Sequence, residues 1–195
     1  MDRDYELTLI KAVQNGNPQA FAELYNAHVD RIYRYVYMRV SSAEVAQDLT
    51  ADVFLKVLES LPNYQARDVP LLGWMYHIAH CRIVDYYRRG RQKFQHFDLD
   101  KVSSSSEDKV DDALVIEQES KRLEAAVRQL SPDQQQVIIL RFVEGHNLET
   151  TARLLNKTVG SVKVIQYRAT QRLAKLLDDK ALTNDEQFGM LGFSI

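Results

Sequence analysis

The sequence predicts an all-α protein made of two small helical domains joined by a flexible acidic linker. Three observations lead to this prediction. Apolar residues recur at spacings of three and four along most of the chain, which is the period of one helix face. The alternating β-branched runs typical of strands do not occur. Between residues 95 and 112 the helical period is lost, and Ser103 to Ser106 stand among acidic residues, a composition typical of a linker.

The first domain, residues 1–94, is predicted to be a helical bundle. A loop at 62–70, bounded by prolines, precedes its last helix, which should run from about Leu71 to Arg89. The apolar stripes that define the earlier helices run from Leu7 to Val13, from Phe21 to Val36 and from Val45 to Leu58.

Capping residues mark where these helices begin. Asn17 followed by Pro18 predicts the start of the second helix. Ser41, with Glu44 three residues later, predicts a capping box for a third helix over residues 43–61.

The second domain, residues 113–180, is predicted to contain a helix-turn-helix. A helix of about eight residues, 148–155, is followed by a short turn and a longer helix over 159–177. Asn156 in that turn suits a left-handed backbone. The predicted N-terminal caps of this domain are Ser131 with Gln134, Asn147 and Thr158.

The second helix of this motif has two distinct faces. Val162 and Ile165 should anchor it inward, and the segment 157–175 contains no acidic residue. Outward residues of such a helix meet base edges and phosphates in the major groove. The spacing alone also fits a helical hairpin with a solvated basic face. The residues expected to face outward are Ser161, Lys163, Val164, Tyr167 and Arg168.

Composition narrows the possible environments of the chain. The net charge of −2 hides basic segments at 82–93 and 157–175 and an acidic one at 98–112, a segregation typical of proteins with charged partners. The single Cys81 excludes an internal disulfide. Neither a signal peptide nor an apolar run of membrane-spanning length occurs, so we expect a cytoplasmic chain without membrane insertion.

Several motifs, in order, resemble those of extracytoplasmic-function (ECF) sigma factors of bacterial RNA polymerase. Region 2 of that family is similar to Ala20-Phe21-Ala22-Glu23-Leu24-Tyr25, to the segment from Gln47 to Val57, and to Trp74-Met75-Tyr76-His77-Ile78-Ala79. Region 4 is similar to Leu130-Ser131-Pro132-Asp133-Gln134, to the segment from Leu140 to Gly145, and to residues 152–156, 159–163 and 167–169.

The resemblance implies a subunit that directs promoter-specific transcription initiation. Its partners would be core RNA polymerase, through the clamp helices of the largest subunit and the flap, and promoter DNA. In this family an anti-sigma factor is often a further partner. The main alternative is a stand-alone helix-turn-helix transcriptional regulator whose first domain serves dimerisation or effector binding.

For polymerase binding, the resemblance points to the helix over 43–61. Leu49 and Phe54 could equally be core residues, with the neighbouring acids simply solvated. Ala51 stands where the family usually has glutamine. The residues predicted to bind core polymerase are Asp48, Leu49, Asp52, Phe54 and Lys56.

For the melted −10 element, the resemblance points to the loop at 62–70 and the helix after it. Capture of single-stranded DNA needs aromatic rings for the bases and cations for the backbone. Trp74 alone would more commonly be a core residue. The predicted −10 contacts are Tyr64, Arg67, Trp74, Tyr76, His77, His80, Cys81, Arg88 and Arg89.

For the −35 element, the resemblance points to the five outward residues of the helix-turn-helix, with Arg168 as the candidate for a guanine edge. We predict no catalytic residues, no cofactor and no metal. His77, His80 and Cys81, with His96 downstream, have spacings that could ligate a metal, but a structural zinc site normally has four regularly spaced ligands. The C-terminal tail, residues 181–195, is expected either to pack on a domain or a regulator, or to be a frayed end.

Overall fold

The computed structural model describes residues 2–40, 42–65, 69–94 and 112–189. Within these ranges every regular element is a helix, which confirms the predicted all-α class. The elements are α1 (Arg3–Gln14), α2 (Pro18–Tyr37), α3 (Ala43–Ser60), η1 (Leu61–Asn63), α4 (Leu71–Phe94), α5 (Asp112–Arg128), α6 (Pro132–Ile138), η2 (Ile139–Val143), α7 (Leu148–Leu154) and α8 (Val159–Gly189).

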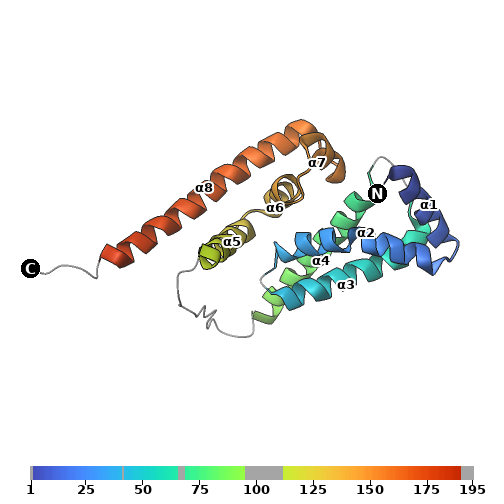
Figure 1. Ribbon diagram of the computed structural model, residues 1–195, viewed down its shortest axis with the longest axis horizontal. Coiled ribbons are helices and arrows are strands. Elements are labelled where there is room, and N and C mark those ends of the chain that lie inside the picture. The colour runs from blue at the N-terminus through green and yellow to red at the C-terminus, as the bar shows by residue number, and fades with distance from the viewer. Residues whose placement is uncertain (1, 41, 66–68, 95–111, 190–195) are drawn as a thin grey trace, which may run out of the picture.

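Helices α1–α4 form an N-terminal bundle, and α5–α8 form a C-terminal half beside it (Figure 1). The buried apolar core is continuous between them, because residues of the C-terminal half such as Leu130, Leu140 and Leu154 belong to the same cluster as Leu24 and Met75 of the bundle. The two halves therefore meet through buried contacts in this structure. The predicted linker at 95–112 lies outside the described residues except for its last residue, with which α5 begins.

Side-chain caps start most of the helices where the sequence predicts. Asn17 accepts hydrogen bonds from the amides of Gln19 and Ala20 at the start of α2. For α3 the prediction was wrong by one residue, because Ser42 is the cap and accepts from the Val45 amide at 3.4 Å.

The caps of the C-terminal half are confirmed. Ser131 and Gln134 form a reciprocal capping box. Asn147 Oδ1 accepts from the Thr150 amide at 2.8 Å, and Thr158 Oγ1 accepts from the Ser161 amide at 3.1 Å. Asn156, in the turn between α7 and α8, has a positive φ of 51°. Local chemistry therefore fixes the ends of both helices of the helix-turn-helix.

Three elements extend or divide differently from the prediction. Helix α4 continues beyond Arg89 to Phe94. Helix α8 continues to Gly189, so that residues 181–189 prolong the helix instead of forming a separate tail, and residues 190–195 lie outside the described ones. The helix that starts at Pro132 changes to a π-helical turn at η2, where the Glu144 amide donates to the Ile139 carbonyl at 2.9 Å.

In the ranges that the structure describes, none of the helices combines the length and the apolar character needed to cross a bilayer.

Candidate nucleic-acid interfaces

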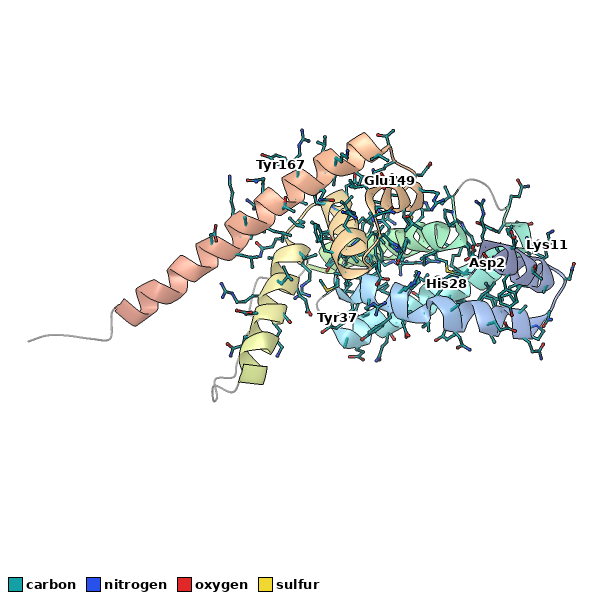
Figure 2. The ribbon with its side chains drawn as sticks, turned by 45° about the horizontal axis from the view of Figure 1, so that its top comes forward. Asp2, Lys11, His28, Tyr37, Glu149 and Tyr167 are labelled. Carbon is teal, nitrogen blue, oxygen red and sulfur yellow. The ribbon has the colours of Figure 1, made fainter. Side chains whose placement is uncertain are left out.

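The outward face of α8 is formed by the residues that the sequence predicts. Ser161, Lys163, Val164, Tyr167 and Arg168 are all exposed, and Tyr167 keeps 67% of its surface (Figure 2). Val162 is fully buried and packs with Val137 and Ala152 in a small separate cluster. Burial of Val162 in this cluster fixes the orientation of α8 about its own axis. The basic and aromatic face of the helix therefore points away from the protein.

Polar contacts hold the other side of α8 to the domain. The guanidinium Nε of Arg141, in η2, donates to Gln166 Oε1 at 2.9 Å, and the same side chain donates through Nη1 to the His146 carbonyl. Lys157 pairs with Asp133 at 3.2 Å. Gln166 and Lys157 therefore serve the packing of the motif, and Lys163 and Arg168 remain exposed to solvent.

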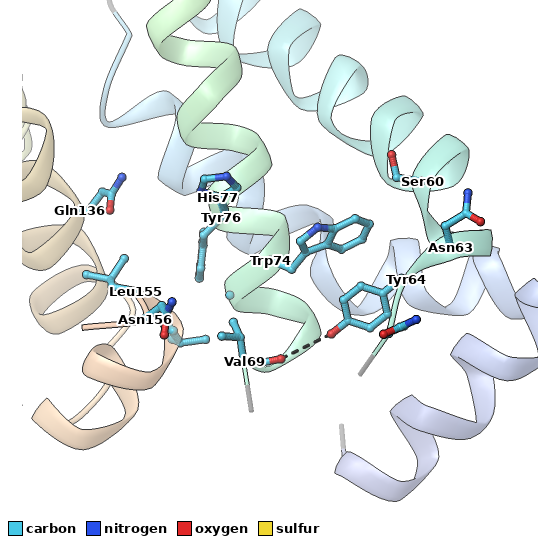
Figure 3. Close-up of a pocket in the computed structure, with 13 residues that line it drawn as sticks. Ser60, Asn63, Tyr64, Val69, Trp74, Tyr76, His77, Gln136, Leu155 and Asn156 are labelled. Atoms are coloured by element: carbon cyan, nitrogen blue, oxygen red, sulfur yellow. Dashed lines mark hydrogen bonds between the residues drawn. The ribbon is translucent and has the colours of Figure 1, made fainter. Parts of the chain in front are cut away.

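A pocket of about 650 Å³ lies beside the N-terminal end of α4 (Figure 3). The rings of Tyr64 and Trp74 pack 4.7 Å apart, and the Tyr64 hydroxyl donates to the Val69 carbonyl at 3.5 Å. Gln14 of α1 holds the backbone next to Tyr64 in place, because its side-chain amide donates to the carbonyls of Leu61 and Tyr64 at 3.1 and 2.9 Å. No sequence pattern pointed to Gln14.

The opposite wall of the pocket comes from the C-terminal half. Gln136 of α6, and Leu154, Leu155 and Asn156 around the α7–α8 turn, face Trp74 and His77 across the opening. The structure thus brings together four of the predicted −10 residues around one pocket: Tyr64, Trp74, Tyr76 and His77. It also places a second domain over them, which sequence patterns did not predict.

Tyr76, also predicted to contact the −10 element, is 1% exposed and lies between the two halves. Its ring packs 4.8 Å from that of Tyr35, and burial raises the pKa of its phenol. The Tyr76 hydroxyl has no hydrogen-bond partner in the part of the chain described. In this structure Tyr76 is therefore closed off from solvent.

His80 lies at the same boundary. Its Nδ1 is 3.2 Å from Arg39 Nη2 and 2.5 Å from Gln136 Nε2. Because both neighbours are donors, Nδ1 must be the acceptor, which requires a neutral imidazole. Burial, aided by the charge of Arg39, lowers the pKa of His80 to about 4.

The remaining predicted −10 residues lie further along α4. Cys81 is exposed, with its sulfur 3.8 Å from His77 Nε2. Arg88 is exposed and pairs with Asp85 at 3.0 Å, and Arg89 is exposed. Arg67 lies outside the described residues.

The candidate metal ligands on α4 do not assemble. Among the residues that the structure describes, no group of three or more His, Cys, Asp or Glu side chains could hold a metal ion. His96 lies outside them.

Helix α3 divides its predicted polymerase contacts between surface and core. Asp48, Asp52 and Lys56 are exposed. Leu49 and Phe54 are 8% and 4% exposed, and the Phe54 ring packs 4.7 Å from that of Tyr25. Leu49 and Phe54 therefore pack into the core, and the charged residues lie on the outward face of α3.

Helix α3 also exposes two leucines, one of which was predicted to face inward. Leu58, expected on the inner stripe, is 44% exposed, and Leu55 is 57% exposed, so both add apolar surface beside the acids.

A groove of about 350 Å³ separates α3 from α4. It is lined by Val45, Asp48, Leu49, Asp52, Arg82, Asp85, Tyr86, Arg89 and Gly90.

Polar contacts between the halves centre on Arg39, which is 2% exposed. Its guanidinium donates to Gln135 Oε1 at 2.9 Å and to the Tyr35 hydroxyl at 2.6 Å. Burial raises the pKa of Tyr35 to about 12. Arg128 donates to the Val40 carbonyl at 3.2 Å. Two residues of the C-terminal half, Gln135 and Arg128, therefore bind the junction between α2 and α3.

A second polar contact lies at the other end of the boundary. Glu144, whose side chain is 2% exposed, pairs with Arg34 of α2 at 2.9 Å and with Arg31 at 3.9 Å. The hydrogen bond from Arg34 to this carboxylate raises the pKa of Arg34. A carboxylate removed from water in this way depends on its arginine partners.

Family models and solved structures agree with the architecture. Residues 24–93 match the model of Sigma-70 region 2, and residues 126–175 match Sigma-70, region 4. The fold is similar to that of CnrH in complex with the cytosolic domain of CnrY, with 21% identity, a TM-score of 0.66, and coverage of 91% of this chain and 99% of that one. It is also similar to the sigma factor RpoE of Bartonella quintana, with 22% identity, a TM-score of 0.59, and coverage of 81% and 96%.

Curated relatives carry the same description. The chain is 36% identical to the ECF RNA polymerase sigma factor BldN of Streptomyces coelicolor over 90% of this chain and 67% of that protein. It is 30% identical to the ECF sigma factor SigD of Mycobacterium tuberculosis over 81% and 77%. The region 2 match disfavours a stand-alone regulator. The chain therefore belongs to the ECF sigma factors and functions as an RNA polymerase sigma factor in promoter-specific transcription initiation.

Proposed function

We propose that this sigma factor binds promoter DNA through two surfaces and core polymerase through a third. Residues 1–94 would act as region 2, residues 113–180 as region 4, and residues 95–112 as the segment that lets them move apart. Its role would be recognition, with RNA synthesis left to the polymerase, and its place of action would be the cytoplasm, where polymerase and promoter meet.

The −35 duplex would be bound by the outward face of α8. The observation that carries this proposal is the division of that helix: the residues that the motif needs inside are buried, and Lys163, Val164, Tyr167 and Arg168 are exposed together. Basic residues continue along the helix as Arg172 and Lys175, which suits the phosphate backbone. Val164 would contact a thymine methyl, and Arg168 a guanine edge.

The test is a comparison of two α8 variants in holoenzyme, made with core polymerase and a randomised promoter library. Arg168→Ala should lose preference for one base pair in the selected −35 element, by about 1–3 kcal/mol. Lys175→Ala should weaken binding to all sequences alike and reduce the dependence on salt. Unchanged base preference in Arg168→Ala would refute the assignment of this residue.

The melted −10 strand would be captured at the pocket beside α4. Tyr64 and Trp74 offer adjoining aromatic rings, His77 also lines the pocket, and Arg88 and Arg89 lie further along the same helix. Base stacking on aromatic rings with nearby cations is the usual way to hold single strands. The arginines would hold the backbone without selecting sequence.

Core polymerase would be bound by the exposed side of α3. Asp48 and Asp52 lie one turn apart, with Lys56 a turn further, and Leu55 and Leu58 add apolar contact. Asp48→Asn with Asp52→Asn should weaken holoenzyme formation, measured by gel filtration with core polymerase. The matched control is Asp4→Asn, an exposed acid on α1. Equal binding by the double variant and the control would refute this surface.

An anti-sigma partner stays a prediction for this chain. The solved RpoE of Bartonella quintana was crystallised in complex with the anti-sigma factor NepR. Purification of the tagged chain from its own cells, followed by identification of stoichiometric partners, would test it.

A further inference from the structure

We propose that Gln14 of α1 is a positioning residue for capture of the melted −10 strand. Its side-chain amide holds the backbone that carries Tyr64, so that the Tyr64 ring lies against Trp74 at the pocket. Gln14 precedes the range 24–93 that matches region 2, so α1 adds a part of the −10 site from outside that range. The inference rests on the proposed function of the pocket and names a residue on which that function depends.

The amide of Gln14 contacts two carbonyl groups of one short segment. Its Nε2 atom lies 3.1 Å from the Leu61 carbonyl oxygen and 2.9 Å from that of Tyr64. An atom placed between two acceptors must be the nitrogen, whose two N–H groups are enough for both bonds. A carboxylate at the same place has no proton to donate and would repel both carbonyl oxygens. An amide therefore fits this position, and an acid of the same shape does not.

Tyr64 needs this support because it lies where regular structure ends. It directly follows η1, with an extended backbone at φ −69° and ψ 130°. Its own amide donates to the Leu61 carbonyl at 3.0 Å, which closes η1. Its hydroxyl donates to the Val69 carbonyl at 3.5 Å, a long and therefore weak hydrogen bond. The two shorter bonds from Gln14 thus join both ends of the segment 61–64 to a neighbouring helix.

Helix α1 is itself held in place, so Gln14 can act as an anchor. The Tyr5 hydroxyl donates to the Glu23 carboxylate of α2 at 2.5 Å. Gln14 is the last residue of α1, at the end that faces η1. The apolar side of α1 packs into the buried core through Leu9, Ile10 and Val13.

The contact between Tyr64 and Trp74 is the part of the pocket that this anchor controls. Trp74 lies on α4 beside the fully buried Met75, whereas Tyr64 lies on the segment that Gln14 holds. Release of the segment would therefore move one ring and leave the other, which divides the aromatic surface offered to the bases. Trp74 is the single tryptophan of the chain, so its fluorescence reports on this contact.

The test compares substitutions that keep or remove the donors of Gln14. Gln14→Ala removes both bonds, Gln14→Glu keeps the shape without the donors, and Gln14→Lys keeps N–H donors at a similar reach. The matched control is Gln19→Ala, at an exposed glutamine in the first turn of α2. Position 14 is exposed, so none of these changes should unfold the bundle. The full chain is examined by acrylamide quenching of Trp74, and holoenzyme by binding to a promoter selected from the randomised library.

Gln14→Ala and Gln14→Glu should increase the quenching of Trp74, whereas Gln14→Lys and Gln19→Ala should match the unmodified chain. In holoenzyme the first two should bind a promoter with a pre-melted −10 element about fivefold more weakly. Their binding to a duplex fragment that carries only the −35 element should not change, a split that general loss of structure would not give. Unchanged quenching or unchanged binding of the pre-melted promoter by Gln14→Ala would overturn the inference, and so would an equal loss with Gln14→Lys.

Tyr64→Ala separates this inference from the proposed function of the pocket. If the pocket captures the strand, Tyr64→Ala should weaken binding of the pre-melted promoter, and Gln14→Ala added to it should weaken binding no further. If Gln14→Ala causes the same loss with and without the Tyr64 ring, Gln14 acts elsewhere and this inference alone fails. If Tyr64→Ala leaves binding unchanged, the −10 function of the pocket fails, and this inference fails with it.

Discussion

The ion pair between Glu144 and Arg34 gives a quantitative test of how the two halves hold together. Glu144→Gln keeps the shape of the side chain and an oxygen that can accept from Arg34 Nε, but it removes the charge. The carboxylate is 2% exposed and lies 2.9 Å from Arg34, whose side chain is 54% exposed. The change should therefore favour separation of the halves without disturbing either one.

The size of the effect follows from this geometry. A charge-assisted hydrogen bond is roughly twice as strong as a neutral one, which sets a loss of about 1–2 kcal/mol for a buried pair. Solvent reaches both arginines, since Arg31 is 47% exposed, and exposed pairs contribute only about 0–1 kcal/mol. We expect Glu144→Gln to reduce the free energy that holds the halves together by about 1 kcal/mol. This reduction lowers the ratio of closed molecules, in which the halves are packed, to open ones, in which they are separated, about fivefold.

The assay is energy transfer between dyes on the two halves, attached at Glu59→Cys and Lys175→Cys in a Cys81→Ser background and measured at increasing salt concentration. The matched control is Glu149→Gln, which removes one charge from an exposed position on α7 (Figure 2). Unmodified protein should open gradually as salt rises, and the Glu144→Gln variant should start more open and respond less. Identical closed fractions in Glu144→Gln and Glu149→Gln would refute the role given to this pair.

Three further predictions concern pH and stability. The packed arrangement of the two halves should become less stable as pH falls from about 6.5 towards 4. The pKa of His80 is about 4 when the halves are packed, so protonation of this residue favours separated halves. The ratio of packed to separated molecules should fall by at most about tenfold per pH unit. His80→Asn retains an acceptor atom and should give a flat energy-transfer profile over this range; a profile as steep as that of the unmodified chain would assign the effect to another group. Val162→Ala, at a fully buried position, should lower the free energy of unfolding in urea by about 2 kcal/mol, whereas Val164→Ala, at an exposed one, should change it by less than about 0.5 kcal/mol. Asn147→Ala removes the cap of α7 and should cost about 1 kcal/mol in the same measurement, and a cost near zero would show that the cap is dispensable.

The helix-turn-helix was predictable because its determinants are local. Asn147 and Thr158 act on amides three residues away, and Asn156 sets the turn by its own backbone. Helical period alone separates Val162 from Lys163. None of these inferences needs knowledge of a distant residue.

The contact between the halves could not be predicted in the same way. Arg39 lies just after α2, and arginine is usually a surface residue. It is nevertheless buried by partners such as Gln135 that lie far away in sequence. Leu58 follows the apolar period of α3, yet 44% of it is exposed. Sequence patterns report which face of a helix is apolar, and they do not report what another element brings to that face.

The π-helical turn η2 holds one residue more than an α turn, and such turns behave as single-residue insertions in an otherwise regular helix. The Glu144 amide bonds the Ile139 carbonyl, five residues back, so five residues stand where an α turn would hold four. Deleting the exposed Phe142 would restore α geometry, and the same amide would then bond the same carbonyl four residues back. Glu144 would stay beside Arg34, because the chain after the turn would keep nearly the same orientation. This turn is therefore a place where the chain can lose a residue while the boundary between the two halves is kept.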